Sequence, residues 1–190
     1  MIESPVPIVL ASRSTTRRRL LSRLVTDFEV VRPQVDEAAI HAQTPRELVL
    51  EAAEAKARAV ARVRPDALVI GADTVVACRE GVIGKPVDRA DAVRILRRLT
   101  RSPHDVLTGL CLVAPDGREV SGCVAATLQM RQMSDAELER LADRPGALDR
   151  AGAYELQPDD PNVVHLDGHP TTVMGLPLEE LERAFHELYP

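Results

Sequence analysis

The chain has 190 residues, of which 45% are hydrophobic and 28% are charged, and its formal net charge is −5 at pH 7. The negative charge and the scarcity of aromatic side chains (two Phe, two Tyr, no Trp) argue against a general binder of nucleic acid or of an anionic membrane surface. No leader-like segment and no apolar run of membrane-spanning length occurs, and the three cysteines lack metal-ligand spacing. We therefore expect a cytoplasmic protein.

Strands and helices alternate along the first half of the chain. Short apolar runs predict three strands, at residues 6–11, 28–31 and 67–76. Between the first two, a leucine repeat with helical spacing predicts a helix that ends near Val25. Residues 44–47 (Thr-Pro-Arg-Glu) combine an N-cap, a first-turn proline and a capping-box glutamate, so a longer helix should run from there to about Arg64.

The second half adds antiparallel character. A hairpin-like segment surrounds Gly81, and Asp88 caps a helix. Two long strands, 106–114 and 120–131, are joined by a Pro-Asp-Gly turn, and Ser134 opens a helix that ends near Ala142. Residues 144–161 predict a loop with a turn and short strand at 151–157, before a strand at 163–166 and a helix at 178–188. We expect one α/β domain over residues 1–190.

Lysine is unusually rare in this chain. Of the 24 basic residues, only Lys56 and Lys85 are lysines and the other 22 are arginines. A compact ammonium on a flexible stem can reach a single phosphate oxygen at a tight site where a planar guanidinium is a poor substitute. The two lysines are therefore candidates for phosphate binding, although the count alone equally allows two leftover surface residues.

Two further segments could carry chemistry. Ser12, Ser14 and Arg17 lie where a strand leads into a helix N-terminus, which favours an anion, although ordinary helix capping explains the serines equally well. Asp73 lies in an apolar strand beside small residues, where a carboxylate needs a partner, a metal or a cleft. Glu37 follows a strand and could supply an oxygen ligand to a hard cation, or form part of a solvated acidic loop.

The ordered set of segments resembles the Maf family of nucleoside triphosphate pyrophosphatases. The matching stretches span nearly the whole chain: LASRSTTRR at 10–18, VDE at 35–37, AKA at 55–57, GADTV at 71–75, GKP at 84–86, HDVLTG at 104–109, AGAY at 151–154 and VMGLP at 173–177. The resemblance implies a fold related to the inosine triphosphate pyrophosphatases. That fold is an elongated, bent mixed sheet flanked by helices, with two lobes and a central cleft.

The resemblance also implies a reaction and its residues. A nucleoside triphosphate is hydrolysed to the monophosphate and pyrophosphate with a divalent metal cation, Mg²⁺ or Mn²⁺, and the family's usual assembly is a homodimer. Asp73 would be the general base. Phosphate contacts would come from Ser12, Ser14, Arg17, Lys56 and Lys85, and the metal would be held by Glu37 and Asp73.

Three positions bear on the choice of base. The family members that act on dTTP and UTP resemble this chain at Thr74 and Gln157, and a glutamine amide can donate to and accept from a pyrimidine edge. The same pattern has arginine where this chain has Thr16. We therefore predict a dTTP/UTP pyrophosphatase whose range could extend to modified pyrimidine nucleotides, with Thr16 as the position that departs from the pattern.

Three other functions compete with this prediction. A 7-methyl-GTP or purine-type pyrophosphatase would share the same fold, and turnover of UTP against 7-methyl-GTP separates the two. A regulator of cell division would bind triphosphates without hydrolysing them, although a pure binder would not need the carboxylate of Asp73. A nucleic-acid-binding module fits the acidic net charge poorly.

Overall fold

The computed structural model describes residues 1–79, 81–156 and 160–190. Within these residues, seven strands form one mixed sheet in the order β2-β1-β3-β5-β6-β7, with β4 paired to β3. The strands are β1 (Ile8–Ala11), β2 (Glu29–Val31), β3 (Leu68–Cys78), β4 (Gly81–Ile83), β5 (His104–Val113), β6 (Glu119–Met130) and β7 (Val163–Asp167). The strands β2, β1 and β3 run parallel, and the other pairings are antiparallel.

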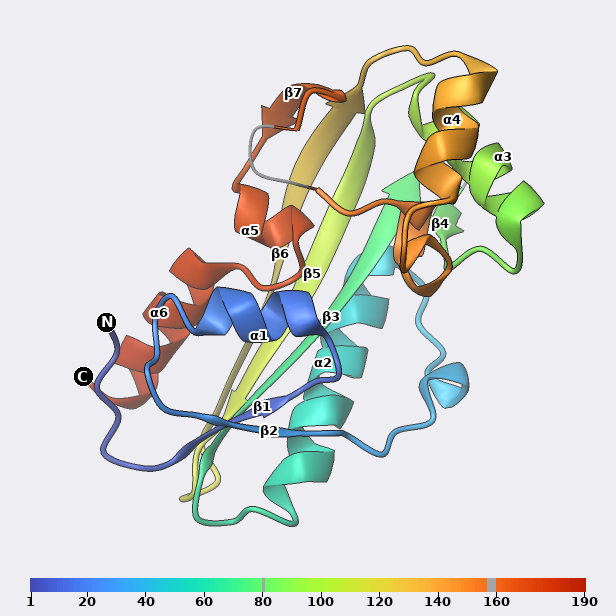
Figure 1. The fold of residues 1–190 in the computed structure, drawn as a ribbon. Helices are drawn as coiled ribbons and strands as arrows, with labels where there is room; N and C mark the ends of the chain where they lie inside the picture. The colour runs from blue at the N-terminus through green and yellow to red at the C-terminus, as the bar shows by residue number, and fades with distance from the viewer. Residues whose placement is uncertain (80, 157–159) are drawn as a thin grey trace.

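Helices cover both faces of the sheet (Figure 1). They are α1 (Thr15–Leu21), α2 (Pro45–Ala61), α3 (Arg89–Leu99), α4 (Asp135–Ala142), α5 (Pro170–Val173) and α6 (Leu178–Leu188), with short 3₁₀ turns η1 (Glu37–Ala39), η2 (Ala147–Asp149) and η3 (Ala151–Ala153). Because side chains alternate along a strand, Ile70 and Ala72 of β3 pack with α1 and α6, whereas Val69 packs with α2 on the opposite face.

One edge of β3 is left open in its middle. The strand β1 pairs with this edge only as far as Gly71, and β4 pairs with it again only from Val76 onwards. The other edge of β3 is occupied throughout by β5. Among the described strands, none pairs with residues 72–75 on the open edge. A ligand at this edge could therefore contact the backbone of β3 and side chains from both faces of the sheet.

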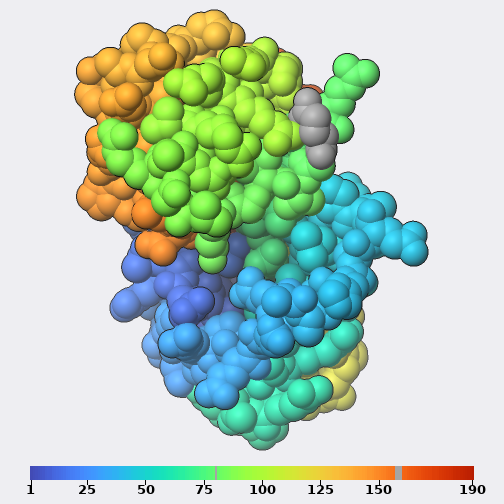
Figure 2. Space-filling model, turned by 90° about the vertical axis from the view of Figure 1, so that its right-hand side faces the viewer, coloured from blue at the N-terminus to red at the C-terminus, as the bar shows by residue number. Residues whose placement is uncertain are grey.

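The open edge coincides with a cleft between two lobes. One lobe holds β1, β2, α1, α2 and α6, and the other packs α3, α4 and η3 around Val76 and Ile83 as a separate apolar cluster. Figure 2 shows the hollow between them, with the segment around residue 150 above the N-terminal segment. The cleft thus lies where the parallel strands β1 and β2 end, as is usual for ligand sites in open α/β sheets.

Two glycines let α2 lie unusually close to the sheet. A side chain at Gly71 would meet the carbonyl oxygen of Ala53 and the backbone nitrogen of Ala57, and one at Gly109 would meet the backbone of Val49. Gly71 and Gly109 therefore allow the α2 backbone to rest directly on β3 and β5. This close packing determines how far a side chain of α2 can reach across the sheet.

The sequence predictions of secondary structure are largely confirmed. The α/β class, the mixed sheet, the long hairpin, the α2 capping box and the 178–188 helix are all present. The first helix ends at Leu21 rather than near Val25, because the chain turns through bonds from Arg23 N to Leu20 O and Leu24 N to Leu21 O. The longer helix stops at Ala61, short of Arg64.

The loop before β7 also differs from expectation. Of the turn and short strand predicted at 151–157, the turn is present as the 3₁₀ turn η3, in which Gly152 has φ 73°, and residues 154–156 form no strand. That left-handed conformation interrupts an extended strand and favours glycine. Two one-turn elements were not predicted, η1 with three residues and α5 with four. Among the described helices, none is long and apolar enough to cross a membrane.

The packing of α2 can be tested at Gly109. We expect Gly109→Ala to lower the free energy of unfolding by about 1–3 kcal/mol, because the added methyl group would have to displace the α2 backbone. Gly122→Ala in β6 is the matched control, since its added Cβ would meet only Glu180 Oε1 at 3.4 Å. Urea unfolding of both variants measures the difference. Equal stability of the two variants would contradict the close approach.

Candidate active site

One buried ammonium joins two of the predicted site residues. Lys56 Nζ lies 2.6 Å from Asp73 Oδ1 and 3.0 Å from Glu37 Oε1. The Lys56 side chain is only 8% exposed, against 16% for Asp73 and 54% for Glu37. A charge so deeply buried is retained only with opposite charges beside it. The structure therefore brings together Glu37, Lys56 and Asp73 from three separate elements, η1, α2 and β3.

Alternation along β3 explains this meeting. Gly71 and Asp73 are two residues apart, so both face α2. Gly71 admits the α2 backbone, and the stem of Lys56 then needs only to extend along the sheet to reach Asp73. Glu37 reaches the same ammonium from the first turn of η1, where Asp36 caps the turn by accepting a hydrogen bond from Ala38 N. Asp36 is thus a structural cap.

The segment between β1 and α1 supplies two hydroxyl groups. Ser12 Oγ accepts a hydrogen bond from Ser14 N at 3.1 Å, and Ser14 Oγ caps α1 by accepting one from Arg17 N at 3.2 Å. Each hydroxyl has one proton to donate, and neither of these bonds uses it. Ser12 is 5% exposed and directly follows the end of β1. Both serines can therefore donate to an anion at the open edge.

Arg17 is held by a chain of hydrogen bonds on the other face of the sheet. Its Nε donates to Gly175 O at 2.7 Å and its Nη2 to Thr74 Oγ1 at 2.9 Å. Thr74 and Thr108 Oγ1 are 2.9 Å apart, and Thr108 donates to Thr172 O, so Thr74 must donate to Thr108. These bonds leave Nη1 of Arg17 for a ligand.

Charges from both faces act on the cleft. Burial lowers the pKa of Arg17, whereas the carboxylates of Asp73 and Glu37 oppose that shift. Burial alone would raise the pKa of Glu37, but the cations of Lys56, Lys85 and Arg13 outweigh it and lower the pKa below 4.5. Lys85 is exposed and lies just after β4, on the far wall of the cleft. Three of the predicted phosphate-binding residues, Arg17, Lys56 and Lys85, thus lie near enough to the acidic pair for their charges to act on it.

The three predicted specificity positions have different outcomes. Thr74 uses its hydroxyl to hold Arg17, and a specificity role for it stays a prediction. Thr16 donates its hydroxyl proton to Glu155 Oε1 at 2.7 Å. Gln157 lies outside the described residues. Glu155 and its partner Arg150 were not predicted as site residues, although they directly flank the stretch at 151–154 that carried the resemblance.

The acidic pair fits a hard divalent cation. Among the described residues, no cluster of three or more His, Cys, Asp or Glu side chains that could hold a metal ion is found. Lys56 Nζ contacts one oxygen of each carboxylate, Glu37 Oε1 and Asp73 Oδ1, so the second oxygen of each is the one that could bind a cation. Two carboxylates completed by substrate phosphates are a common way to bind Mg²⁺, so the donor set matches such an ion.

The lowered pKa of Glu37 predicts how stability depends on pH. The folded-state pKa of Glu37 lies below the ordinary 4.5, so at neutral pH its ionised carboxylate stabilises the native state relative to the unfolded chain. This stabilisation is lost as the pH falls through the folded-state pKa. We expect Glu37→Gln to cost at most about 1 kcal/mol at pH 7, because Glu37 is 54% exposed. Thermal unfolding measured from pH 7 down to about pH 3, which spans the ordinary range of glutamate titration, gives this cost.

The wild-type and Glu37→Gln curves should converge at acid pH. Glu51→Gln, which alters an exposed glutamate of α2, is the control and should follow the wild type at every pH. A Glu37→Gln difference that is the same at all pH values would show that the carboxylate charge makes no contribution there.

Known proteins resemble this chain in sequence over nearly its whole length. Residues 7–188 match the family model described as Maf-like protein. The dTTP/UTP pyrophosphatase of Elusimicrobium minutum is 37% identical over 95% of this chain and 97% of its own length. That of Geotalea uraniireducens is 36% identical over 99% and 98%. A crystal structure of a nucleoside-triphosphatase / dITP/XTP pyrophosphatase from Mycobacterium abscessus has TM-score 0.45 and 20% identity, covering 67% of this chain and 75% of that one. The chain belongs to the Maf family.

Proposed function

We propose that this chain is a nucleoside triphosphate pyrophosphatase that hydrolyses dTTP and UTP to the monophosphate and pyrophosphate. The observation that carries the proposal is the group formed by Lys56, Asp73 and Glu37 at the open edge of β3, next to the hydroxyls that follow β1. Curated relatives that span nearly the whole chain and are named dTTP/UTP pyrophosphatases support the substrate class.

The open edge supplies groups of both signs within one cleft. On the α2 face lie the carboxylates with Lys56, and on the opposite face lies Arg17, held by Thr74. A triphosphate carries several negative charges that must be neutralised before a water molecule can attack it. Cations and hydroxyl donors fixed in advance around the phosphates supply that stabilisation without reorganisation during the reaction.

In our proposal Asp73 is the general base. It takes a proton from the attacking water while the water oxygen bonds to the α-phosphorus. The bond that breaks joins the α-phosphorus to the oxygen bridging it to the β-phosphorus. Pyrophosphate leaves with the bonding electrons, and the monophosphate stays. Asp73 Oδ1 is bonded to Lys56, so the second carboxylate oxygen is the one available to the water. The ammonium holds the carboxylate in a fixed orientation.

The remaining residues bind the phosphate groups. Ser12 and Ser14 donate their hydroxyl protons, Arg17 offers Nη1, and Lys85 approaches from the other lobe. Lys56 is close enough to Asp73 to serve the base and the phosphates together. Glu37 and Asp73 would hold the divalent cation, Mg²⁺ or Mn²⁺, which when bound adds positive charge beside the phosphates and acidifies water.

We also propose that residues 1–190 act as one catalytic domain. A single sheet contributes strands to both lobes, and the predicted site residues come from both sides of the cleft, which supports this. A cytoplasmic location is part of the same proposal and is supported by the odd number of cysteines.

Replacement of the general base tests the reaction. We expect Asp73→Asn to lower kcat for pyrophosphate release from UTP by about 10²–10⁴-fold, the usual contribution of a general base. UTP binding should be retained, because asparagine still accepts a hydrogen bond from Lys56. The assay compares dTTP, UTP, CTP, 7-methyl-GTP, ITP and the common purine triphosphates with Mg²⁺ or Mn²⁺. Asp116→Asn, in the exposed turn between β5 and β6, is the control.

The panel also separates the competing functions. A preference for 7-methyl-GTP would keep the reaction and overturn the pyrimidine substrates. If the wild-type protein and Asp73→Asn bound UTP equally and neither released pyrophosphate, the chain would be a nucleotide-binding regulator instead of an enzyme.

A further inference from the structure

Glu155 bridges the two walls of the cleft. Its Oε1 accepts a hydrogen bond from the hydroxyl of Thr16 at 2.7 Å, and its Oε2 lies 2.8 Å from Nη2 of Arg150. Thr16 belongs to α1 in one lobe, whereas Arg150 belongs to the loop of the other lobe. The Glu155 side chain is 22% exposed, so part of it still faces solvent. A carboxylate with both oxygens fixed and one side open is well prepared to receive a ligand.

The partner Arg150 is itself held in place. Its Nη1 donates to Pro145 O at 3.1 Å, and its guanidinium packs over Gly146, where a Cβ would lie 2.8 Å from Nη1. Gly146 also has φ 78°, a conformation that favours glycine. The loop therefore fixes Arg150, and Arg150 in turn fixes Glu155. This arrangement limits the freedom of the carboxylate before any ligand binds.

Glu155 also lines a cavity in the same lobe. The cavity has a volume of about 390 Å³, and its walls include Arg144, Arg150, Tyr154 and the apolar side chains of Leu141 and Ala153. Mostly apolar walls with a few fixed polar groups are typical of pockets that take small organic molecules. Arg150 in this wall is already bonded to Glu155 and to Pro145 O, and a nucleoside has both the apolar faces and the polar edges that such a mixed lining can contact.

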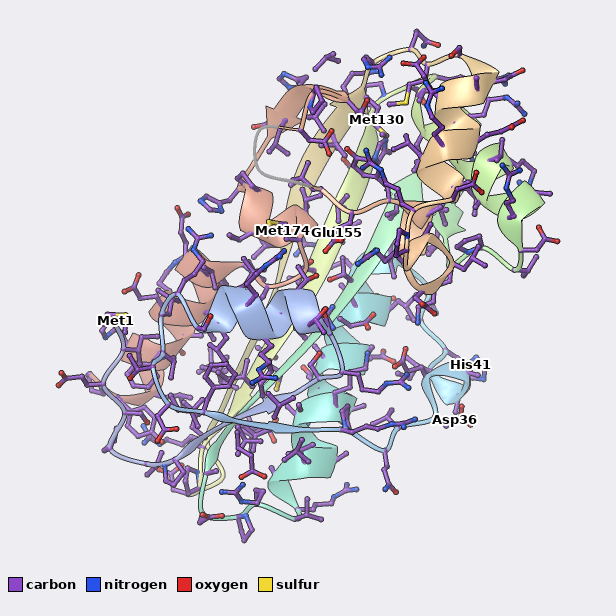
Figure 3. The ribbon with its side chains drawn as sticks, in the orientation of Figure 1. Met1, Asp36, His41, Met130, Glu155 and Met174 are labelled. Atoms are coloured by element: carbon purple, nitrogen blue, oxygen red, sulfur yellow. The ribbon has the colours of Figure 1, made fainter. Side chains whose placement is uncertain are left out.

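The cavity and the phosphate-binding segment are connected through Thr16. Thr16 lies in the first turn of α1, between Ser14 and Arg17. Figure 3 shows Glu155 above the N-terminal end of this helix. A nucleotide whose phosphates lie at Ser12 and Ser14 therefore brings its sugar and base towards Glu155. This placement rests on the proposed function.

We propose that Glu155 is a specificity-determining residue that accepts a hydrogen bond from the nucleoside. An ionised carboxylate can only accept, so it selects a donor on the substrate. Three groups of a pyrimidine ribonucleotide have this chemistry, the 2′- and 3′-hydroxyls of the sugar and an N–H on the base edge, and only the 2′-hydroxyl and the base edge differ among natural nucleotides. Thr16 and Arg150 each occupy one lone pair of the carboxylate, and the other lone pairs remain for the substrate.

This proposal explains the departure at Thr16. The dTTP/UTP pattern that the chain otherwise resembles has arginine there, a side chain that only donates hydrogen bonds. In this chain the short Thr16 leaves room for Glu155, and the position presents an acceptor instead. Thr16 and Glu155 together therefore present an acceptor to the nucleoside in this chain.

The test measures kcat/KM for UTP, dUTP and CTP with the wild type, Glu155→Gln and Glu155→Ala. We expect Glu155→Ala to lower kcat/KM by about 10- to 100-fold for each nucleotide that carries the donor, the usual effect of losing a hydrogen bond to a charged group. Nucleotides that lack the donor should change less than about threefold. Glu155→Gln keeps one acceptor oxygen, so its kcat/KM for nucleotides that carry the donor should lie between those of the wild type and Glu155→Ala. Glu187→Gln, at an exposed position of α6, is the matched control.

The ratios identify the donor. If UTP and CTP lose activity and dUTP does not, the 2′-hydroxyl is the donor. If UTP and dUTP change together and CTP responds differently, the donor is an N–H of the base. An equal effect on all three nucleotides, or no effect, would overturn the specificity role, because neither a purely structural bridge to Thr16 and Arg150 nor a bond to the 3′-hydroxyl, which all three carry, discriminates among them.

Failure of the proposed function would be recognised separately. If the wild type releases pyrophosphate from none of the nucleotides, the same ratios are taken from dissociation constants measured by calorimetry. Discrimination by Glu155 in binding would then support the specificity role without the reaction. Absence of nucleotide binding altogether would overturn both proposals.

Discussion

The ammonium of Lys56, buried between Asp73 and Glu37, is the contact on which the rest of the site depends. A buried charge without partners costs several kcal/mol, so α2 has to place the Lys56 ammonium within contact distance of both carboxylates. It can do so because Gly71 and Gly109 remove the side chains that would hold α2 away from the sheet. The core packing of α2 and the chemistry of the cleft are therefore one constraint, not two.

The open edge of β3 makes these fixed side chains accessible to a ligand. Beyond the end of β1, no described strand pairs with residues 72–75 on the edge of β3 opposite β5, and the two faces of the sheet come within reach of one ligand there. Asp73 and Thr74 point to opposite faces, one to Lys56 and the other to Arg17. In our proposal a triphosphate at this edge is neutralised from both faces, with the base on one of them.

The sequence predicted most of the fold because its signals are local. Capping residues, apolar runs and a Pro-Asp-Gly turn act within a few residues, and the elements they predicted are present. The contacts of the site depend on tertiary structure and were predicted only through the resemblance. Nothing local shows that Thr74 would be used to hold Arg17, or that Glu155 would reach Thr16 across 139 positions of the chain. The one-turn elements η1 and α5 are too short to have a periodic signal.

The central claim is that the acidic pair at the open edge of β3 is where nucleotide and metal bind. Anomalous diffraction from crystals grown with Mn²⁺ and a non-hydrolysable UTP analogue tests it most directly. Our account predicts a manganese peak at the carboxylates of Glu37 and Asp73, with phosphate density beside Ser12, Ser14 and Lys85. Manganese and nucleotide bound elsewhere, for example among the arginines around Arg144, with the open edge of β3 unoccupied, would contradict it.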